Sequence, residues 1–515
     1  KEHQQLALKI AEQSMVLLKN ENSLLPFDQS SLKSIAVIGP NANVARTGGH
    51  GSSKVIPFYA VTPLEGIKNL VGENIQVHFA VGEELVEPEL KLIDSQYLTP
   101  SQGKGKGLYG EYFDNVDFAG KPVFTRVDQD LDFDFKDDTL REVMKKDSFS
   151  IRWTGTFMPP ETKEYKFDLN SDDGSRLYIN DELLIDNWGV HPPRLKSGTI
   201  KLETGKSYQV KIEYAEIGFG AMFQFGWSPP FDFEAYKKKV NEAVGIAKKS
   251  DVVVLCAGSA DFIEGEGLDK EGLELPGHQD YLIEKVAEAN PNTVVVLYGC
   301  APMSTKKWLD KVNGLVLAWF PGQEGGNGLA RILFGEVNPS GKLPFSYIQD
   351  YAESPVFKQY KDEGMKMHYD EGVFIGYRWL DKNKVPIKFP FGYGLSYTQF
   401  KFSNMKIEEH GDSKFTVHVN VENVGERKGA EVVQLYVGDI ACKVPRPEKE
   451  LKGFEKVELN PGENKDVAIH LEKPAFSFYN VETHSWEIEP GEFEIMVGSS
   501  SRDIHLKKSI NLSIH

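Results

Sequence analysis

Short runs of continuously apolar residues alternate along the chain with stretches whose apolar residues recur at helical spacing. The apolar runs indicate strands that are buried on both faces of a parallel sheet. Strands are predicted at 34–40, 75–82, 251–258, 292–299 and 314–320, and helices at 1–20, 62–70, 234–250, 278–290 and 304–312. This alternation of strand and helix is typical of a doubly wound α/β sandwich with a mostly parallel sheet.

The alternation is interrupted between residues 108 and 227, where short strands are separated by turns rich in Gly, Asp and Pro. This pattern predicts a β-sandwich inserted at an exposed loop of the α/β domain, entered through the Gly-rich linker 101–107. From residue 391 apolar and polar positions alternate, which predicts a fibronectin type III-like β-sandwich. The predicted domain limits are 1–100 and 231–390 for the α/β domain, 101–230 for the insertion and 391–515 for the last domain.

The composition fits several globular domains and excludes some partners. At 515 residues the chain is long enough for roughly three or four domains. Its 59 Lys and Arg against 76 Asp and Glu give a net charge of −17, which repels nucleic acids and anionic membranes. No window reaches the roughly 18 apolar residues of a membrane helix, so no membrane span is expected. Cys256, Cys300 and Cys442 are too scattered for a disulfide framework or a zinc site and are predicted to be buried thiols.

The first segment, KEHQQLALKIAEQSMVLLKN, is amphipathic and lacks the uninterrupted apolar core of a signal peptide. A helix that starts at residue 1 with no capping residue before it suggests that the chain begins inside a longer protein. An upstream signal peptide would make that protein periplasmic or secreted, and without one it would be cytoplasmic.

The densest group of candidate catalytic residues follows the predicted strand that ends at Gly258. Ligand sites in open α/β sheets lie at the carboxyl ends of the strands. There the sequence EGEGLD places Glu264, Glu266 and Asp269 close together on a Gly-rich backbone. Neighbouring carboxylates raise one another's pKa, which suits the general acid of a glycoside hydrolase. A solvated acidic loop and a calcium site built from alternating carboxylates are the alternatives.

Six segments together carry a more specific resemblance. They are AEQSMVLLKNENSLLPF, IAVIGPNA, EGEGLDKEGLELPGHQ, PGQEGGNGLARILFGEVNPSGKLPFS, YDEGVFIGYRW and FPFGYGLSYTQF, in this order. By these motifs the chain resembles the C-terminal portion of a family 3 glycoside hydrolase of the β-glucosidase type. The resemblance implies that Glu266, the second glutamate of EGEG, is the general acid/base. It also implies that the aspartate nucleophile lies on a (β/α)8 barrel upstream of Lys1, and that no metal or cofactor is needed.

The resemblance implies further roles. His50, in the loop GGHGSS, and Glu264 become candidate substrate-binding residues. The stretch 108–227 resembles a protective-antigen-type β-sandwich, a class in which paired aspartates of certain lectins bind calcium and sugar. Asp172 and Asp173 are the matching pair here, and an ordinary Asp-Asp-Gly turn between strands is the alternative.

The function implied is hydrolysis of terminal non-reducing β-D-glucosyl residues from small β-glucosides by a retaining mechanism. This chain would supply the general acid/base, and the barrel would be its partner. One alternative is a β-xylosidase. Another is a catalytically inactive carbohydrate-binding or scaffolding fragment.

Overall fold

The computed structural model divides the chain into two compact units. The first comprises Lys1–Leu85 together with Glu234–His515, and the second comprises Val86–Phe233. The structure describes residues 2–49, 51–85, 90–135, 148–218, 220–228, 231–266, 270, 272–357 and 366–513. Among these residues no helix is both long enough and apolar enough to cross a membrane.

A six-stranded sheet forms the centre of the first unit, in the order β1-β18-β17-β16-β2-β3. Its strands are β1 (Val16–Asn20), β2 (Ser34–Ile38), β3 (Gln76–Ala80), β16 (Val252–Gly258), β17 (Thr293–Tyr298) and β18 (Gly314–Leu317). All neighbouring pairs are parallel except β1 on β18. Every residue of β2, β16, β17 and β18 is buried, as the continuous apolar runs predicted.

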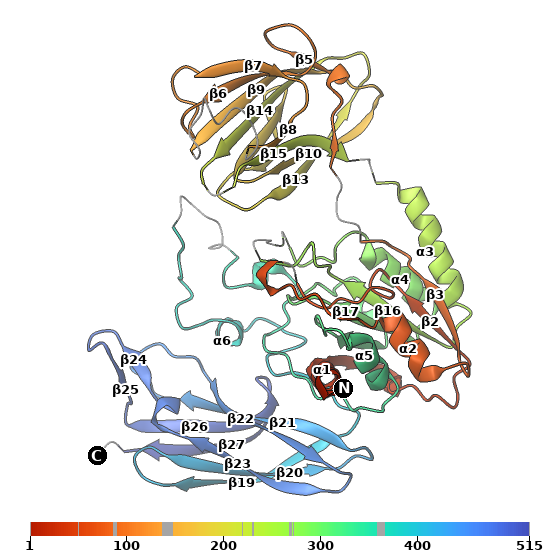
Figure 1. Ribbon diagram of the computed structural model, residues 1–515. Coiled ribbons are helices and arrows are strands. Elements are labelled where there is room, and N and C mark those ends of the chain that lie inside the picture. Colours follow the sequence, from red (N-terminus) through yellow and green to blue (C-terminus); the bar gives the residue numbers. More distant parts are fainter. Residues whose placement is uncertain are drawn as a thin grey trace. The chain divides into compact units, whose positions relative to one another are not determined.

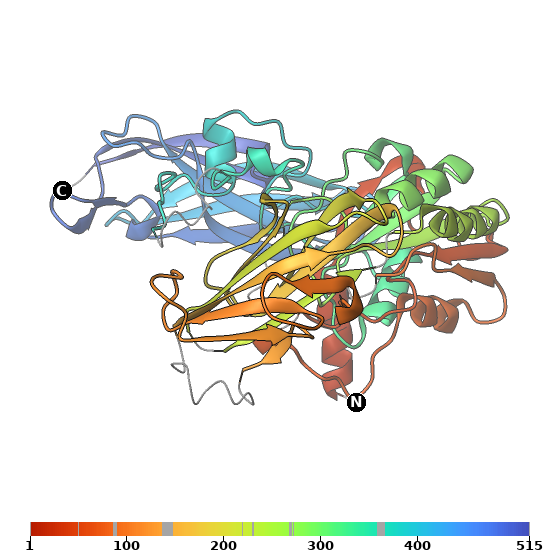
Figure 2. The same cartoon turned by 90° about the horizontal axis from the view of Figure 1, so that it is seen from above.

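Helices cover both faces of this sheet (Figure 1, Figure 2). They are α1 (Glu2–Ser14), α2 (Pro63–Val71), α3 (Phe233–Ala247), α4 (Gln279–Ala289) and α5 (Gly325–Leu333), with the short α6 (Tyr377–Lys382) beyond the sheet. Apolar residues of α1, α2 and α5 pack on one face, and those of α3 and α4 pack on the other. The predicted α/β sandwich with a mostly parallel sheet is confirmed.

Two predicted helices differ from the structure. The helix predicted over residues 1–20 ends at Ser14, and the chain continues as β1, which pairs antiparallel with the edge strand β18. The helix predicted over 304–312 contains only a short 3-10 turn, Leu309–Lys311. In α1, moreover, Leu6 and Ile10 are 55% and 58% exposed, so the apolar face inferred from the sequence is not covered by the described residues.

The second unit contains two antiparallel β-sheets around an aromatic core. Its strands are β4 (Lys91–Leu92), β5 (Leu98–Pro100), β6 (Leu108–Phe113), β7 (Phe124–Asp128), β8 (Asp132–Asp134), β9 (Phe149–Phe157), β10 (Lys163–Ser171), β11 (Gly174–Ile179), β12 (Glu182–Asn187), β13 (Arg194–Leu202), β14 (Tyr208–Glu216) and β15 (Met222–Ser228). Trp153, Phe157, Phe167 and Phe223 are fully buried between the sheets. The unit begins before the predicted boundary at residue 101, because β4 and β5 pair with β15 and β9.

The C-terminal part of the first unit is a second β-sandwich. Its strands are β19 (Phe400–Glu409), β20 (Phe415–Asn423), β21 (Gly429–Asp439), β22 (Glu450–Leu459), β23 (Asn464–Leu471), β26 (Gly491–Ser500) and β27 (Asp503–Leu512), with a hairpin of β24 (Phe478–Asn480) and β25 (Ser485–Glu487). Several contacts fasten it to the α/β domain, among them an ion pair and a side-chain hydrogen bond. The Lys342 ammonium lies 2.7 Å from the Glu431 carboxylate, and the Gln434 amide donates to the Gly392 carbonyl at 3.0 Å.

Candidate active site

The loops that follow β2, β16, β17 and β18 gather at one edge of the sheet, because parallel strands all end there (Figure 1). Glycine begins three of these loops, and its two tightest positions are Gly39 after β2 and Gly258 at the end of β16. Both have positive φ, 112° and 118°. A Cβ on Gly39 would stand 2.3 Å from the Cys256 carbonyl oxygen, and one on Gly258 would stand 2.1 Å from that of Tyr298. The backbone can therefore leave the sheet here only with glycine.

Glu264, in the loop after β16, is tied into the protein by both carboxylate oxygens. Its Oε2 accepts a 2.6 Å hydrogen bond from the backbone N–H of Cys300, and its Oε1 lies 3.0 Å from the Lys270 ammonium. The side chain is only 9% exposed. Glu264 thus joins the loop after β16 to the loop after β17 and carries a charge that Lys270 compensates.

Glu266 lies two residues further along the same loop and is exposed. Its Oε2 accepts a 2.9 Å hydrogen bond from the backbone N–H of Ser52, which belongs to the loop after β2. Gly51, beside it, has a φ of 81°, and a Cβ there would stand 2.6 Å from the Glu266 Cβ. The loop after β2 therefore forms a close-fitting support for this carboxylate.

The electrostatics of Glu266 differ from the sequence-based expectation. The hydroxyl and backbone N–H of Ser52 lower the pKa of Glu266 below its ordinary value. The sequence argument expected neighbouring carboxylates to raise it. That argument was wrong for this chain because Lys270 neutralises Glu264, while Ser52 donates hydrogen bonds to the charged form of Glu266.

A hydrogen-bonded chain of polar side chains braces the same two loops, and sequence reasoning missed it. Arg46 donates from Nε to the Asn41 side chain at 2.8 Å and pairs through Nη1 with Asp261 at 2.9 Å. Asn41 is fully buried and donates to the Ser259 carbonyl at 3.2 Å. Asn41 and Arg46 lie more than 200 positions from Ser259 and Asp261 along the chain, so no local pattern could have revealed these contacts between the loops.

The loop after β18 holds a further buried carboxylate, Glu324, which is 7% exposed. It accepts hydrogen bonds from the Tyr59 hydroxyl and, at 2.7 Å, from the Asn327 amide. The loop that carries Ser52 is therefore fastened again, at Tyr59, to the start of α5. Together these contacts hold Glu266 at the carboxyl edge of the sheet with its carboxylate facing solvent.

Comparison with known proteins agrees with this arrangement. Residues 15–397 match the C-terminal domain of glycosyl hydrolase family 3, and residues 431–501 match a fibronectin type III-like domain. The chain belongs to glycoside hydrolase family 3. The resemblance inferred from the six motifs is confirmed, and so is the fibronectin type III-like nature of the last domain.

Curated relatives extend the match over nearly the whole length of this chain. This chain is 36% identical to a β-glucosidase of Kluyveromyces marxianus. The match covers 98% of this chain and 62% of that protein. It is 35% identical to a β-glucosidase of Rhizobium radiobacter, covering 100% of this chain and 63% of that protein. The chain thus spans a little over three fifths of the length of these relatives.

Solved structures of the family agree in fold. The K. marxianus β-glucosidase in complex with glucose superposes with a TM-score of 0.70 at 35% identity, covering 100% of this chain and 63% of that one. A β-glucosidase from Streptomyces venezuelae in complex with D-glucose gives a TM-score of 0.72 at 31% identity, covering 99% and 60%.

Two of the candidate residues near this site cannot be compared with the structure. His50 and Asp269 lie outside the described residues.

The cysteine prediction is correct for Cys256, which is buried in β16, and wrong for Cys300, which is exposed. Cys300 lies just beyond the end of β17, where the apolar run gives way to the loop at the sheet edge; Cys442 is partly exposed.

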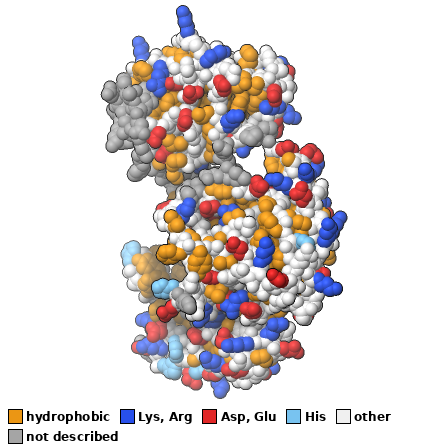
Figure 3. Space-filling view, turned by 45° about the vertical axis from the view of Figure 1, so that its right-hand side comes forward, with side chains coloured by type: hydrophobic (Ala, Val, Ile, Leu, Met, Phe, Trp, Pro, Cys, Tyr) orange, Lys and Arg blue, Asp and Glu red, His pale blue; other side chains and the backbone are white. Residues whose placement is uncertain are grey.

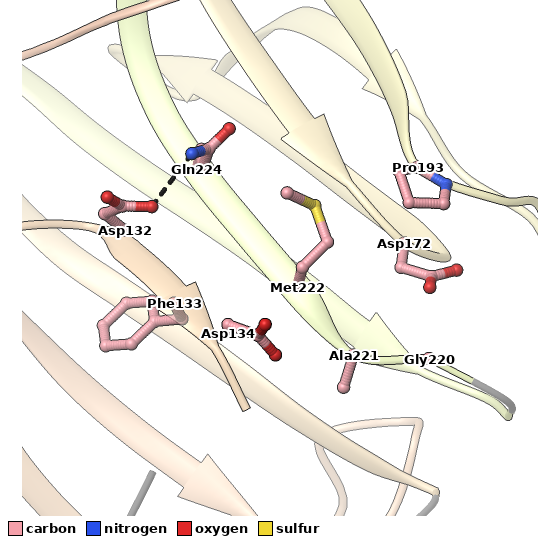
Figure 4. A pocket seen from close by; sticks show the side chains of 9 residues that line it. All are labelled: Asp132, Phe133, Asp134, Asp172, Pro193, Gly220, Ala221, Met222 and Gln224. Carbon is pink, nitrogen blue, oxygen red and sulfur yellow. Dashed lines mark hydrogen bonds between the residues drawn. The ribbon is translucent and has the colours of Figure 1, made fainter. Parts of the chain in front are cut away.

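The aspartate pair of the inserted sandwich adopts a tight turn. Asp173 has a φ of 62° and is 1% exposed. Its carboxylate accepts hydrogen bonds from the backbone N–H groups of Ile217, Gly218 and His191 at 2.7, 3.0 and 3.1 Å. Asp172 lines a separate pocket of about 340 Å³ near Gln224 (Figure 4). In the part of the chain that the structure describes, no three His, Cys, Asp or Glu side chains are grouped to hold a metal ion.

Replacing Gly51 with Ala tests the support of Glu266. The new Cβ would overlap the Glu266 side chain, displace the Ser52 donors and raise the pKa of Glu266 toward its ordinary value. The positive φ adds about 1 to 2 kcal/mol of strain. Carbon-13 NMR titration of the Glu266 carboxyl measures the pKa. Gly411→Ala is the control, since Gly411 has a similar φ of 77° and no atom within 4 Å of its Cβ position. An equal pKa in both variants would contradict the role of the contact.

Proposed function

We propose that this chain supplies the general acid/base of a retaining β-glucosidase, and that Glu266 performs both steps. The observation that carries the proposal is the placement of Glu266. Its carboxylate is exposed at the sheet edge, where α/β domains bind ligands, and two loops hold it in position. The β-glucosidase names of the K. marxianus and R. radiobacter relatives support the choice of substrate.

The chemistry requires a second carboxylate. A retaining enzyme places two carboxyl groups about 5 to 5.5 Å apart, one attacking the sugar and one protonating the leaving oxygen. Glu264 is a poor nucleophile, because Lys270 and the Cys300 N–H engage both of its oxygens. We therefore assign the nucleophile to the (β/α)8 barrel that the family resemblance implies.

The two steps place opposite demands on Glu266. In the first step it donates a proton to the glycosidic oxygen, and in the second it takes one from the attacking water. The Ser52 hydrogen bonds favour the ionised form, which suits the second step. Substrate and the nucleophilic carboxylate would remove water and add like charge, and both effects raise a carboxyl pKa toward the value that the first step needs.

An apolar segment beside the site is the proposed docking surface for the barrel. Val55, Ile56 and Phe58 follow Ser52 in the chain and are 70%, 89% and 103% exposed. Figure 3 shows hydrophobic side chains exposed in patches among charged and other side chains. Exposed apolar groups of this kind mark protein interfaces. Burial of this segment against the barrel would close the site around Glu266 and bring the nucleophile to it.

The proposal is tested in the complete enzyme, meaning this chain together with the barrel. Cellobiose should yield glucose, and the double variant Ile56→Ser/Phe58→Ser should lose about 100-fold in kcat/KM, because burying two apolar side chains contributes about 3 kcal/mol to docking. Phe454→Ser, which alters an apolar residue 65% exposed on β22, is the control and should keep full activity. Release of xylose from xylosides in preference to glucose from glucosides would support the xylosidase alternative. Sugar binding without cleavage would support the binding fragment.

A further inference from the structure

One small cluster of side chains fastens both connections between the first unit and the inserted sandwich. The chain leaves the first unit at Leu85 and returns at Glu234. Glu83 lies just before the exit and Tyr236 lies just after the return. Both side chains are buried, at 5% exposure each, and both contact the residue that precedes α4.

That shared residue is His278. The Oε1 atom of Glu83 accepts a 2.6 Å hydrogen bond from the His278 backbone N–H, and the Tyr236 hydroxyl donates to the His278 carbonyl at 2.7 Å. Glu83 also lies against Gly277, where a Cβ would stand 2.2 Å from Oε1. The outgoing and incoming segments are thus both held to the start of one helix.

The hydrogen-bond geometry favours a neutral carboxyl group on Glu83. The Tyr236 hydroxyl has a single proton, and the 2.7 Å bond to the His278 carbonyl uses it. Its oxygen lies 3.5 Å from Oε2 of Glu83. A proton on Oε2 can therefore face the Tyr236 oxygen, in a contact at the outer limit of hydrogen-bond distance. When Oε2 is ionised, the same 3.5 Å contact places its negative charge against a lone pair of the Tyr236 oxygen.

The surroundings favour the same protonation state. Burial raises the pKa of Glu83 to about 7; the His278 N–H, which donates to Oε1, limits the rise, and the Asp280 carboxylate adds to it. Asp280 is itself paired with Lys307 at 2.8 Å.

Among the residues that the structure describes, the other ionisable groups near the cluster carry little opposing charge. Burial lowers the pKa of His278, so its ring is neutral near pH 7. The ring of Tyr281 packs 6.0 Å from that of Tyr236. Lys239 of α3 pairs with the neighbouring Glu84 at 3.0 Å.

We propose that Glu83 is a pH-dependent switch at the root of the inserted sandwich. Its neutral carboxyl group closes both connecting segments onto α4, and its ionisation loosens them together. The sign follows from the raised pKa: the stabilisation of the closed cluster is complete below the ordinary carboxyl value of 4.5 and is lost as the pH rises through about 7.

Hydrogen exchange followed by mass spectrometry tests the switch without using activity. Segments 76–85 and 233–247 of the wild-type chain should open about tenfold more readily at about pH 8 than at about pH 5, after correction for intrinsic exchange. Glu83→Gln should show no such difference, since its amide stays neutral, accepts from His278 and donates to Tyr236. Tyr236→Phe should also reduce the response. Glu84→Gln, at the exposed neighbour, should respond like the wild type.

Three results would overturn the proposal. One is equal opening of the wild-type segments at the two pH values. Another is an undiminished pH response in Glu83→Gln. The third is a pH response that Glu84→Gln removes as completely as Glu83→Gln does. None of these results bears on glucoside hydrolysis, so the switch and the proposed function can fail separately.

Discussion

Glu266→Gln should lower kcat of the complete enzyme on cellobiose by about 100- to 10,000-fold, the usual contribution of a general acid/base. Glutamine keeps the shape and still accepts the Ser52 hydrogen bond but cannot deliver a proton to the leaving sugar. Aryl glucosides whose leaving groups need no protonation should lose much less in the first step. Steady-state and burst kinetics on the two substrate types measure the difference.

Glu274→Gln is the matched control for this prediction. Glu274 is an exposed glutamate further along the same segment, and the structure gives it no contact with Glu266. The control should retain wild-type kcat on both substrates. If Glu266→Gln hydrolyses cellobiose at the wild-type rate, or if both variants lose activity equally, the assignment of Glu266 is wrong.

Glu264→Ala should cost about 3 to 5 kcal/mol in the free energy of unfolding, because it leaves the Lys270 charge without its buried partner. It also removes the acceptor of the Cys300 N–H, so the loop that carries Glu266 should lose its anchor to the loop after β17. Chemical denaturation of the chain measures the stability, and kcat of the complete enzyme reports the displacement of Glu266.

A double variant separates this structural role from the substrate binding predicted for Glu264. Glu264→Gln/Lys270→Met keeps an acceptor for Cys300 and removes the uncompensated ammonium, so most of the stability should return. If Glu264 bound substrate, its replacement would instead raise KM and leave the free energy of unfolding unchanged. The double variant would then not restore the wild-type KM. That second pattern would contradict the structural role.

Much of the fold was predictable because it depends on local patterns. The continuous apolar runs of β2, β16 and β17 predicted burial on both faces of the sheet. The period-two pattern of β20 predicted one buried face and one face toward solvent. The error at β1 has a non-local cause. Residues 16–20 continue the helical spacing of α1, and only the free edge of β18, about 300 residues away, makes them a strand.

The candidate site, too, was predictable from local patterns only in part. The EGEG motif identified Glu266 as the candidate acid/base, but the direction of its pKa shift depends on Ser52, which is 214 positions away. The ion pair of Glu264 with Lys270 is close in sequence, yet no periodic pattern marks it. Sequence motifs therefore indicated which residue to examine, and long-range contacts determined its environment.

The central claim, that Glu266 is the acid/base and not the nucleophile, is tested most directly by azide rescue of Glu266→Ala in the complete enzyme. Azide needs no general base and fits the space left by the carboxylate. With an activated aryl β-glucoside, it should attack the glycosyl-enzyme intermediate and restore turnover. Proton NMR of the product should show β-glucosyl azide, because two successive inversions retain the configuration. An α-glucosyl azide, which would make Glu266 the nucleophile, or no rescue at all, would contradict the account.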